Sequence, residues 1–277
     1  MSIIANRNIQ SIVKTLSDLG YSVGVETVFR DWCECCALAI ANGCDLLHGK
    51  IWERREKRYI DIIGKYKKDA GKFPEMLAQL TNAFEADPWQ DHLGNVYMEC
   101  FGGNKHLGQC FTPIDVCEVC ATTCIEPPFH DTEGGRKPIT VNDCAVGGGA
   151  MLIAACKVFQ EKHRINYQRD VLFYANDVDS LCVHMCYVQL SLLGARAVVE
   201  QKNTITQQLF DTFISPMQAL FPVPSLASLA FGTDETDETD ETDENSDEMD
   251  AETYALLYGD GEETHTEQRK EIQLKLF

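Results

Sequence analysis

The sequence predicts an α/β fold in which a helical N-terminal segment precedes a doubly wound, parallel sheet and an acidic tail follows it. Three observations support this. Residues 1–90 show helical apolar spacing, strand-like and helix-like runs alternate from residue 139 onward, and a Thr-Asp-Glu repeat fills residues 233–244. Alternating strands and helices form parallel sheets with right-handed crossovers. We therefore divide the 277-residue chain into three parts: a helical subdomain (residues 1–90), an α/β core (residues 91–221) and a linker with an acidic tail (residues 222–277).

Residues 1–90 are expected to form a subdomain of four helices. Apolar residues recur at helical spacing in the first three, and the fourth runs from Pro74, a favoured first-turn residue, to about Ala86. The three apolar stripes are Ile9, Ile12, Val13 and Leu16; Val28, Trp32, Cys35, Cys36 and Ala39; and Ile51, Tyr59, Ile62, Ile63 and Tyr66, within a segment from Ile51 to Lys68.

The core is expected to begin with a helix opened by Thr112-Pro113 and running through Thr123. A buried strand, a glycine loop with a helix, a second strand and a second helix then follow, and the second helix ends at Gly194. A third strand and a fourth strand complete the core. In order, these elements occupy residues 139–146, 147–163, 170–177, 180–194, 195–201 and 209–215.

The tail holds most of the net charge of −19. Residues 232–277 contain 17 acidic and three basic residues, whereas residues 1–231 contain 26 and 21. The repeat Thr233–Glu244 lacks apolar residues, so we predict that it is disordered. No apolar run approaches the roughly 20 residues of a membrane helix, and the N-terminal sequence MSIIANRNIQ lacks the features of a signal peptide. We therefore expect a cytoplasmic protein.

Thirteen cysteines leave two interpretations open. Without a signal peptide, a disulfide framework is disfavoured. Cys117, Cys120 and Cys124 have the spacing of metal ligands, but they also lie on one face of the expected helix, as do Cys182 and Cys186. Reduced cysteine packs as a small apolar residue, and no second pair completes a zinc set. The core interpretation is therefore favoured, and no metal site is assigned.

The segment Asp143–Ala150, with the sequence DCAVGGGA, carries the strongest chemical signal. Glycines let the backbone approach a ligand closely, and the following helix offers free N–H groups. Asp177 ends the next strand, where a carboxylate can accept hydrogen bonds from both ribose hydroxyls of a nucleoside-containing cofactor. Neither the GxGxxG fingerprint nor the phosphate-binding Lys-Ser/Thr pair is present. A tight turn without a ligand remains an alternative.

Four consecutive blocks of the chain resemble adenine-N6 DNA methyltransferases, and their pattern is most similar to the modification subunits of type I restriction systems. The blocks are DHLGNVYMECFGGNKHLGQCFTPIDV, VNDCAVGGGAMLIAA, FYANDVDSLCVHMCYVQLSLLGA and KNTI. Their order matches that of the family over about residues 90–214. The resemblance implies a Rossmann-like methyltransferase core that binds S-adenosylmethionine.

The resemblance also implies a role for each matching residue. Gln109 and Thr112, in GQCFTP, are expected to face the methionine end of the cofactor, Asp177 to hold the ribose, and Asn203 to approach the adenine. The family's glycine loop is matched by Asp143, Ala145, Gly147 and Gly149 and not by Cys144, Val146, Gly148 and Ala150. Capping and turn formation are the alternative roles of Asp143, Asp177 and Asn203.

No catalytic residue can be assigned from the resemblance. The family's Asn/Asp-Pro-Pro-aromatic block binds the adenine amino group and stacks on the extruded base. In this chain the Phe210-Asp211 strand opening is followed by Ser215-Pro216 rather than by that block. Glu126-Pro127-Pro128-Phe129 imitates it, but precedes the first strand and has Glu in place of Asn. From the resemblance, we also expect this sequence to lack the family's target-recognition domain.

Three classes of function follow. The first is a DNA adenine-N6 methyltransferase of a restriction-modification system or mobile element, whose sequence readout comes from a partner specificity subunit. The second is an inactive cofactor-binding regulatory subunit, and the third is a protein whose acidic tail mimics nucleic acid. The C-terminal Gln273, Leu274, Leu276 and Phe277 resemble the peptide that docks on the bacterial sliding DNA clamp, and self-packing of this end is the alternative.

Overall fold

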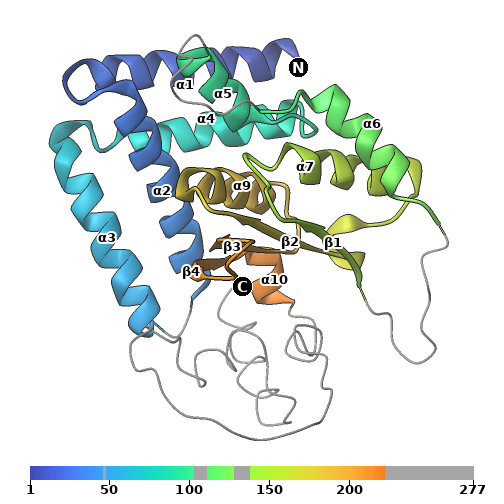
Figure 1. Ribbon diagram of the computed structural model, residues 1–277. Coiled ribbons are helices and arrows are strands. Elements are labelled where there is room, and N and C mark those ends of the chain that lie inside the picture. The colour runs from blue at the N-terminus through green and yellow to red at the C-terminus, as the bar shows by residue number, and fades with distance from the viewer. Residues whose placement is uncertain (46–47, 103–110, 128–137, 222–277) are drawn as a thin grey trace, which may run out of the picture. The chain divides into compact units, whose positions relative to one another are not determined.

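The computed structural model describes residues 1–45, 48–102, 111–127 and 138–221 (Figure 1). The account below concerns Met1–Leu220, whose described residues belong to one compact unit. The predictions for Gln109, the acidic repeat and the clamp-like peptide lie outside the described residues. Within the described part of the chain, no helix is long and apolar enough to cross a membrane.

The four helices expected in residues 1–90 are confirmed. They are α1 (Ile3–Val23), α2 (Val25–Cys44), α3 (Lys50–Tyr66) and α4 (Lys72–Ala86), and a short 3-10 turn, Lys67–Asp69, follows α3. Most residues of the predicted stripes are buried or pack against the core. Ala39 is exposed, contrary to the prediction, although Trp32 and Cys36 of the same stripe are buried.

A further helix, α5 (His92–Phe101), was not predicted; it packs against α1, α2, α4 and α9 (Ser180–Leu192). The rings of Tyr97 and Phe101 pack on Phe29 of α2 at centroid distances of 6.1 and 5.9 Å. Trp32 donates a hydrogen bond from Nε1 to the carbonyl oxygen of Phe73 (3.2 Å), which joins α2 to α4. The helices and the sheet thus share one hydrophobic core.

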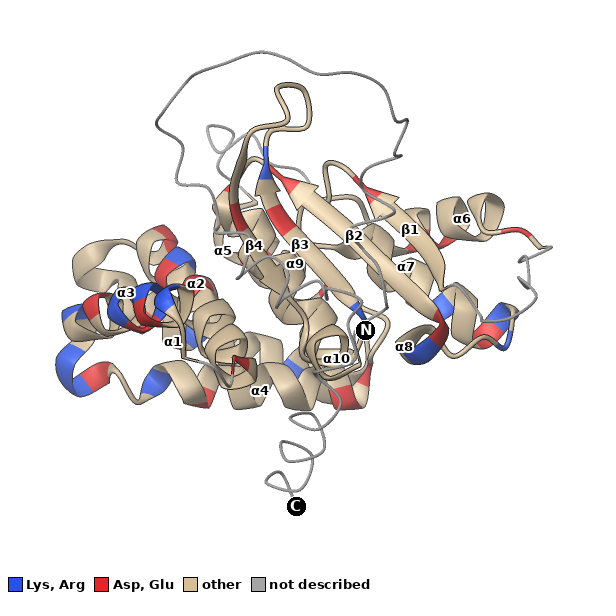
Figure 2. Ribbon diagram, turned by 90° about the horizontal axis from the view of Figure 1, so that it is seen from below, with Lys and Arg blue, Asp and Glu red and all other residues tan. Residues whose placement is uncertain are grey.

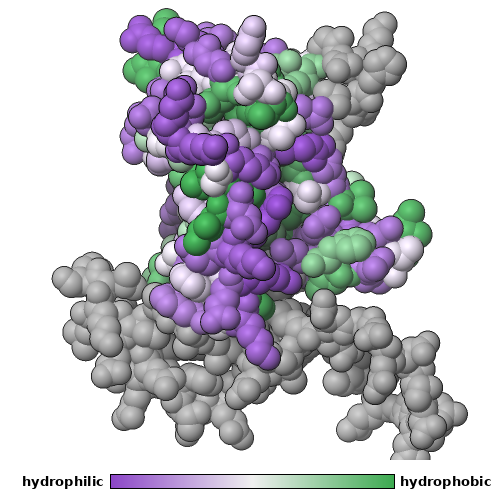
Figure 3. Space-filling view, turned by 90° about the vertical axis from the view of Figure 1, so that its left-hand side faces the viewer, coloured by the Kyte–Doolittle hydropathy of each residue, from purple (hydrophilic) through white to green (hydrophobic). Residues whose placement is uncertain are grey.

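The outer helix α3 is mostly polar, and only Ile62 of its residues is fully buried. Arg58 forms a bidentate ion pair with Glu34 of α2, and Arg55 lies over the Phe213 ring at 5.1 Å. Figure 3 shows the face of the molecule that carries α3, where hydrophilic side chains cover most of the described surface. This helix therefore attaches to the core along one narrow stripe.

The four predicted strands are confirmed as β1 (Ile139–Asp143), β2 (Val171–Asp177), β3 (Ala197–Lys202) and β4 (Leu209–Ile214), which lie side by side in this order. β1, β2 and β3 are parallel, as predicted, whereas β4 is antiparallel to β3. Among the described residues β1 is an edge strand, and each crossover adds the next strand on the same side. The described sheet therefore winds in one direction only, and the prediction of a doubly wound sheet is wrong for this part of the chain.

The remaining helices surround the sheet: α6 (Ile114–Cys124), α7 (Ala150–Lys157) with a π-helical extension (Val158–Lys162), α8 (Tyr167–Asp170), α9 (Ser180–Leu192) and α10 (Pro216–Leu220). α7 and α9 cover the same face of the sheet (Figures 1 and 2). Phe173, Val199 and Phe213 point from that face into the core. Both crossovers from β1 to β3 pass over this face, which places the loops that follow β1 and β2 at the same end of the strands.

Candidate functional site

The carboxyl ends of β1, β2 and β3 meet at one edge of the sheet, where Figure 2 shows acidic segments at the ends of β1 and β2. Asp143 ends β1 and Asp177 ends β2. Thr204 joins the loops beyond the strands, since its Oγ1 accepts a hydrogen bond from Asn176 Nδ2 (2.9 Å) and donates one to the Cys144 carbonyl oxygen (2.8 Å). The fold thus brings distant parts of the sequence together at this edge.

The glycine loop, residues 144–149, needs glycine at two positions. Gly147 has φ +56° and Gly149 has φ +98°, a backbone conformation that L side chains rarely adopt. A Cβ atom on Gly149 would also lie 3.2 Å from Cys186 Sγ. The loop therefore passes close to α9 and enters α7 through a left-handed residue.

Backbone N–H groups of the loop are held by the strand ends. Ala145 donates to Asp143 Oδ1 (3.2 Å), Val146 to the Asn176 carbonyl oxygen (3.1 Å) and Gly147 to Asp177 Oδ2 (3.0 Å). The first turn of α7 adds N–H groups that a helix cannot satisfy internally. The loop is thus fixed on the sheet side and offers donors at the start of α7.

Asp177 has a structural role besides its predicted one. Its Oδ2 accepts from Gly147 N and its Oδ1 from Asp179 N (3.0 Å). Each carboxylate oxygen has a second lone pair, so Asp177 can still accept hydrogen bonds from a ligand. The side chain therefore couples the shape of the loop to any ligand that it binds.

Asn203 uses its side-chain oxygen in a turn. Oδ1 accepts hydrogen bonds from the backbone of Ile205 (3.0 Å) and Thr206 (3.1 Å). The alternative turn role is therefore present, and the amide Nδ2 has no hydrogen-bond partner among the described residues. Asn203 lies at the same edge as Asp177, because β2 and β3 are parallel neighbours.

The site is acidic. Burial raises the pKa of Asp143, the negative charge of Asp177 raises it further, and the hydrogen bond from Ala145 opposes both effects. Neither carboxylate forms an ion pair within the described part of the chain, and residues 143–151 contain no Lys or Arg. Such an edge favours a cationic ligand and repels phosphate groups.

The GQCFTP block reaches the loop through Phe111. A Cβ atom on Gly147 would lie 3.5 Å from the Phe111 ring, which also packs edge-on against Tyr97 at 5.1 Å. Thr112 is exposed just before α6, and Gln109 lies outside the described residues. Phe111 and Thr204 were not assigned as site residues, although both belong to the blocks that carry the resemblance.

The segment after β4 lies at the amino end of β3, which is the end of the sheet opposite the glycine loop. Because β4 is antiparallel, Ser215 comes next to the amino end of β3, where its Oγ donates to the Ala195 carbonyl oxygen (2.7 Å) and accepts from Ala197 N (2.8 Å). Its side chain is fully buried. Ser215-Pro216 therefore cannot reach the glycine loop. Glu126 and Pro127 follow α6, and the rest of the imitating motif lies outside the described residues.

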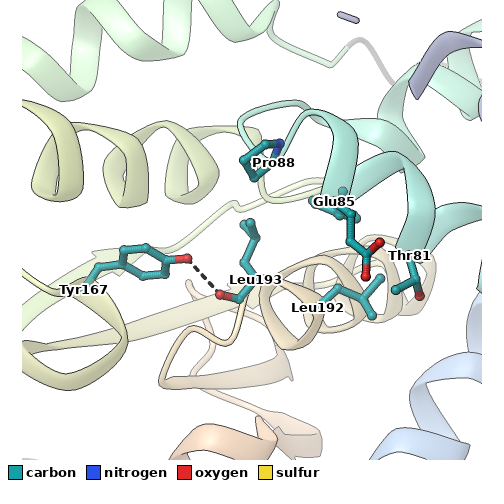
Figure 4. A pocket seen from close by; sticks show the side chains of 7 residues that line it. Thr81, Glu85, Pro88, Tyr167, Leu192 and Leu193 are labelled. Atoms are coloured by element: carbon teal, nitrogen blue, oxygen red, sulfur yellow. Dashed lines mark hydrogen bonds between the residues drawn. The ribbon is translucent and has the colours of Figure 1, made fainter. Parts of the chain in front are cut away.

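A pocket of about 230 Å³ also lies away from the glycine loop. Figure 4 shows its lining by Glu85 and Thr81 of α4, Leu192 and Leu193 at the end of α9, and Tyr167 of α8, whose hydroxyl donates to the Leu193 carbonyl oxygen (2.8 Å). α8 and the end of α9 adjoin the amino ends of β2 and β3. The pocket therefore does not belong to the site.

Most cysteines with suggestive spacing are core residues. Cys117, Cys182 and Cys186 are buried, as the core interpretation predicts, whereas Cys124 is exposed at the end of α6. Burial raises the pKa of the Cys117 thiol to about 11. Among the described residues, no group of three or more His, Cys, Asp or Glu side chains could hold a metal ion.

Comparison with family models matches residues 89–252 to the N-6 DNA methylase family. Comparisons with curated proteins and with solved structures give no match. The family match covers more than half of the chain and includes the glycine loop, Asp177 and Asn203. This match, with which the α/β fold agrees, shows that the chain belongs to the N-6 DNA methylase family.

Proposed function

We propose that this protein binds S-adenosylmethionine at the carboxyl edge of β1–β3 and acts in DNA adenine-N6 methylation. The observation that carries the proposal is the convergence of Asp143, Asp177 and Asn203 around a glycine loop with two left-handed residues. In open α/β sheets, ligands bind outside the carboxyl ends of the parallel strands.

The residues at this edge fit the chemistry of that cofactor. S-adenosylmethionine carries a positive sulfonium and no phosphate, which suits an edge with unpaired carboxylates and no basic side chain in the loop. Asp177 retains acceptor capacity for ribose hydroxyls, and Asn203 Nδ2 is a donor at the same edge. When bound, the cofactor would supply an electrophilic methyl group.

Isothermal titration of the full chain with S-adenosylmethionine tests cofactor binding. We expect saturable binding, and we expect Asp177→Ala to weaken it by about 1.5–3 kcal/mol, as for hydrogen bonds to a charged group. Asp170→Ala is the control, because Asp170 adjoins the other end of the same strand. Absence of wild-type binding at millimolar cofactor, or an equal loss in the control, would contradict the assignment.

The isolated chain is expected to transfer methyl groups weakly or not at all. The place of the catalytic block is taken by Ser215-Pro216, which lies at the edge opposite the glycine loop. This observation favours one of two candidates. The protein is either a cofactor-binding regulatory subunit or an enzyme whose catalytic residues come from another chain. Robust adenine methylation of plain duplex DNA by the purified protein would overturn this expectation.

Two partners are proposed with this function. The type I-like pattern suggests a specificity subunit that reads the DNA sequence. The peptide Gln273-Leu274-Lys275-Leu276-Phe277 suggests docking on a sliding clamp, with Leu276 and Phe277 filling an apolar pocket.

Fluorescence polarisation of a labelled peptide, residues 267–277, with the purified clamp tests the docking. We expect a micromolar dissociation constant that is lost in a peptide carrying both Leu276→Ala and Phe277→Ala. Equal binding by both peptides, or no binding by the wild-type peptide, would exclude it.

A further inference from the structure

A buried carboxyl group lies directly behind the glycine loop, on the side away from the strand ends. Asp91 caps α5 and is only 6% exposed. Its Oδ1 accepts two hydrogen bonds, one from Gly94 N (2.8 Å) and one from Gln189 Nε2 (2.8 Å). Capping alone explains the first bond but not the second.

Gln189 connects this carboxyl group to the loop. It lies on α9 and is fully buried. Its Nε2 also donates to the Gly148 carbonyl oxygen (2.7 Å), and its Oε1 accepts from Leu93 N (3.0 Å). One side chain therefore joins the start of α5, α9 and the middle of the glycine loop.

The packing around the pair leaves little room for the loop to move. A Cβ atom on Gly148 would lie 3.2 Å from Met185 Cε and 3.3 Å from Asp91 Oδ1. A Cβ atom on Gly94 would overlap the Asp91 carboxyl group. The loop thus rests against the pair on one side and is bonded to Asn176 and Asp177 on the other.

Burying two polar side chains in this position lowers the stability of the fold unless all their hydrogen bonds are made. Asp91 forms no ion pair within the described part of the chain, and burial raises its pKa. Apolar side chains would fill the same space without that cost, but they could not fix the direction of the Gly148 carbonyl group. The bonds to the loop are therefore the specific contribution of these two residues.

We propose that Asp91 and Gln189 are positioning residues that hold the glycine loop in its ligand-binding conformation and couple it to the start of α5. The inference rests on the proposed binding of S-adenosylmethionine at that loop. It concerns the side of the loop opposite the predicted contacts of Asp143 and Asp177.

Substitutions can separate charge, hydrogen bonding and general stability. Asp91→Asn keeps an oxygen at the position that accepts both bonds and removes only the charge. Gln189→Leu removes the donor to the loop, and Gln189→Glu replaces that donor with an acceptor at nearly the same volume. Gln218→Leu is the matched control, because Gln218 is a buried glutamine that accepts from Arg196 Nε (3.2 Å) at the other edge of the sheet.

Hydrogen exchange of the ligand-free full chain tests the loop directly. We expect the amides of Val146 and Gly147 to exchange about tenfold faster or more in both Gln189 variants. Asp91→Asn should stay near the wild type, and Gln218→Leu should leave these amides unchanged even if it lowers the melting temperature. Unchanged loop exchange in the Gln189 variants, or equal acceleration in the control, would overturn the inference.

Titration of the same variants with S-adenosylmethionine tests the consequence for binding. We expect a loss of affinity of about tenfold or more in the Gln189 variants only. If the wild type does not bind, the proposed function is wrong, while the exchange data still decide whether the pair positions the loop. If the wild type and both Gln189 variants bind equally, the pair has no role in the site.

Discussion

Gly149 is constrained twice, by a φ of +98° and by the proximity of Cys186 Sγ to its missing Cβ atom. We expect Gly149→Ala to lower the free energy of unfolding by about 2 kcal/mol, because the backbone conformation and the overpacking both oppose a methyl group. Urea denaturation measures the change. Gly64→Ala is the control, since no atom lies within 4 Å of its added methyl group in α3, and a similar loss there would contradict the explanation.

Two buried histidines predict the response to acid. Burial lowers the pKa of both His92 and His184 from the ordinary value of 6.5. The unfolded chain therefore binds protons at a higher pH than the folded chain does. The stability that these residues contribute is complete above pH 6.5 and is lost as the pH falls through their folded pKa values.

We expect His184→Leu to reduce the loss of stability between pH 7 and pH 5, because one of the two histidines no longer takes up a proton on unfolding. Urea midpoints at both pH values measure this. Burial raises the pKa of Asp91 above 3.8, which gives the opposite slope, so the difference between variant and wild type is the relevant quantity. Equal losses in the two proteins would contradict the assignment.

At the level of elements, periodicity located the four described strands and every described α-helix except α5, α8 and α10. α5 was missed, although Asp91 as a cap and the apolar Leu93, Val96 and Tyr97 carry a helical signal. The direction of β4 was not predicted. Only six residues, 203–208, connect β3 to β4, which is too short for a parallel crossover of about a dozen residues or more, so an antiparallel hairpin was required.

The end of β4 can be tested through Ser215. Ser215→Ala removes the buried hydroxyl that accepts from Ala197 N and Gln218 N (3.4 Å) and donates to the Ala195 carbonyl oxygen. We expect a loss of about 1–3 kcal/mol in urea denaturation with unchanged affinity for S-adenosylmethionine. Ser17→Ala, at an exposed site on α1, should be nearly neutral. A selective loss of binding in Ser215→Ala would place this segment in the site instead.

At the level of the whole molecule, charge opposes nucleic-acid binding. Residues 232–252 hold 12 acidic and no basic residues, so their deletion changes the net charge from −19 to −7. We expect the shortened protein to bind duplex DNA more tightly than the full chain at low salt, and the difference to shrink as salt screens it. Fluorescence polarisation with labelled DNA measures this effect.

A variant of the same length, with the 12 acidic residues replaced by Asn and Gln, separates charge from chain length. It should behave like the deletion. If both variants bind DNA as the full chain does, the tail does not compete with nucleic acid for the DNA-binding surface of this chain.

The sequence alone determined the family, the α/β class, the parallel strands and the residues at their carboxyl ends, because these depend on local periodicity and on ordered motifs. Only the tertiary structure decided which roles those residues share. It showed that Asp177 and Asn203 also hold turns, and that Phe111 and Thr204 reach the loop. It also placed Asp91 and Gln189 behind the loop and Ser215 at the far edge. Such contacts join residues up to about a hundred positions apart, as for Asp91 and Gln189, and no local pattern records them.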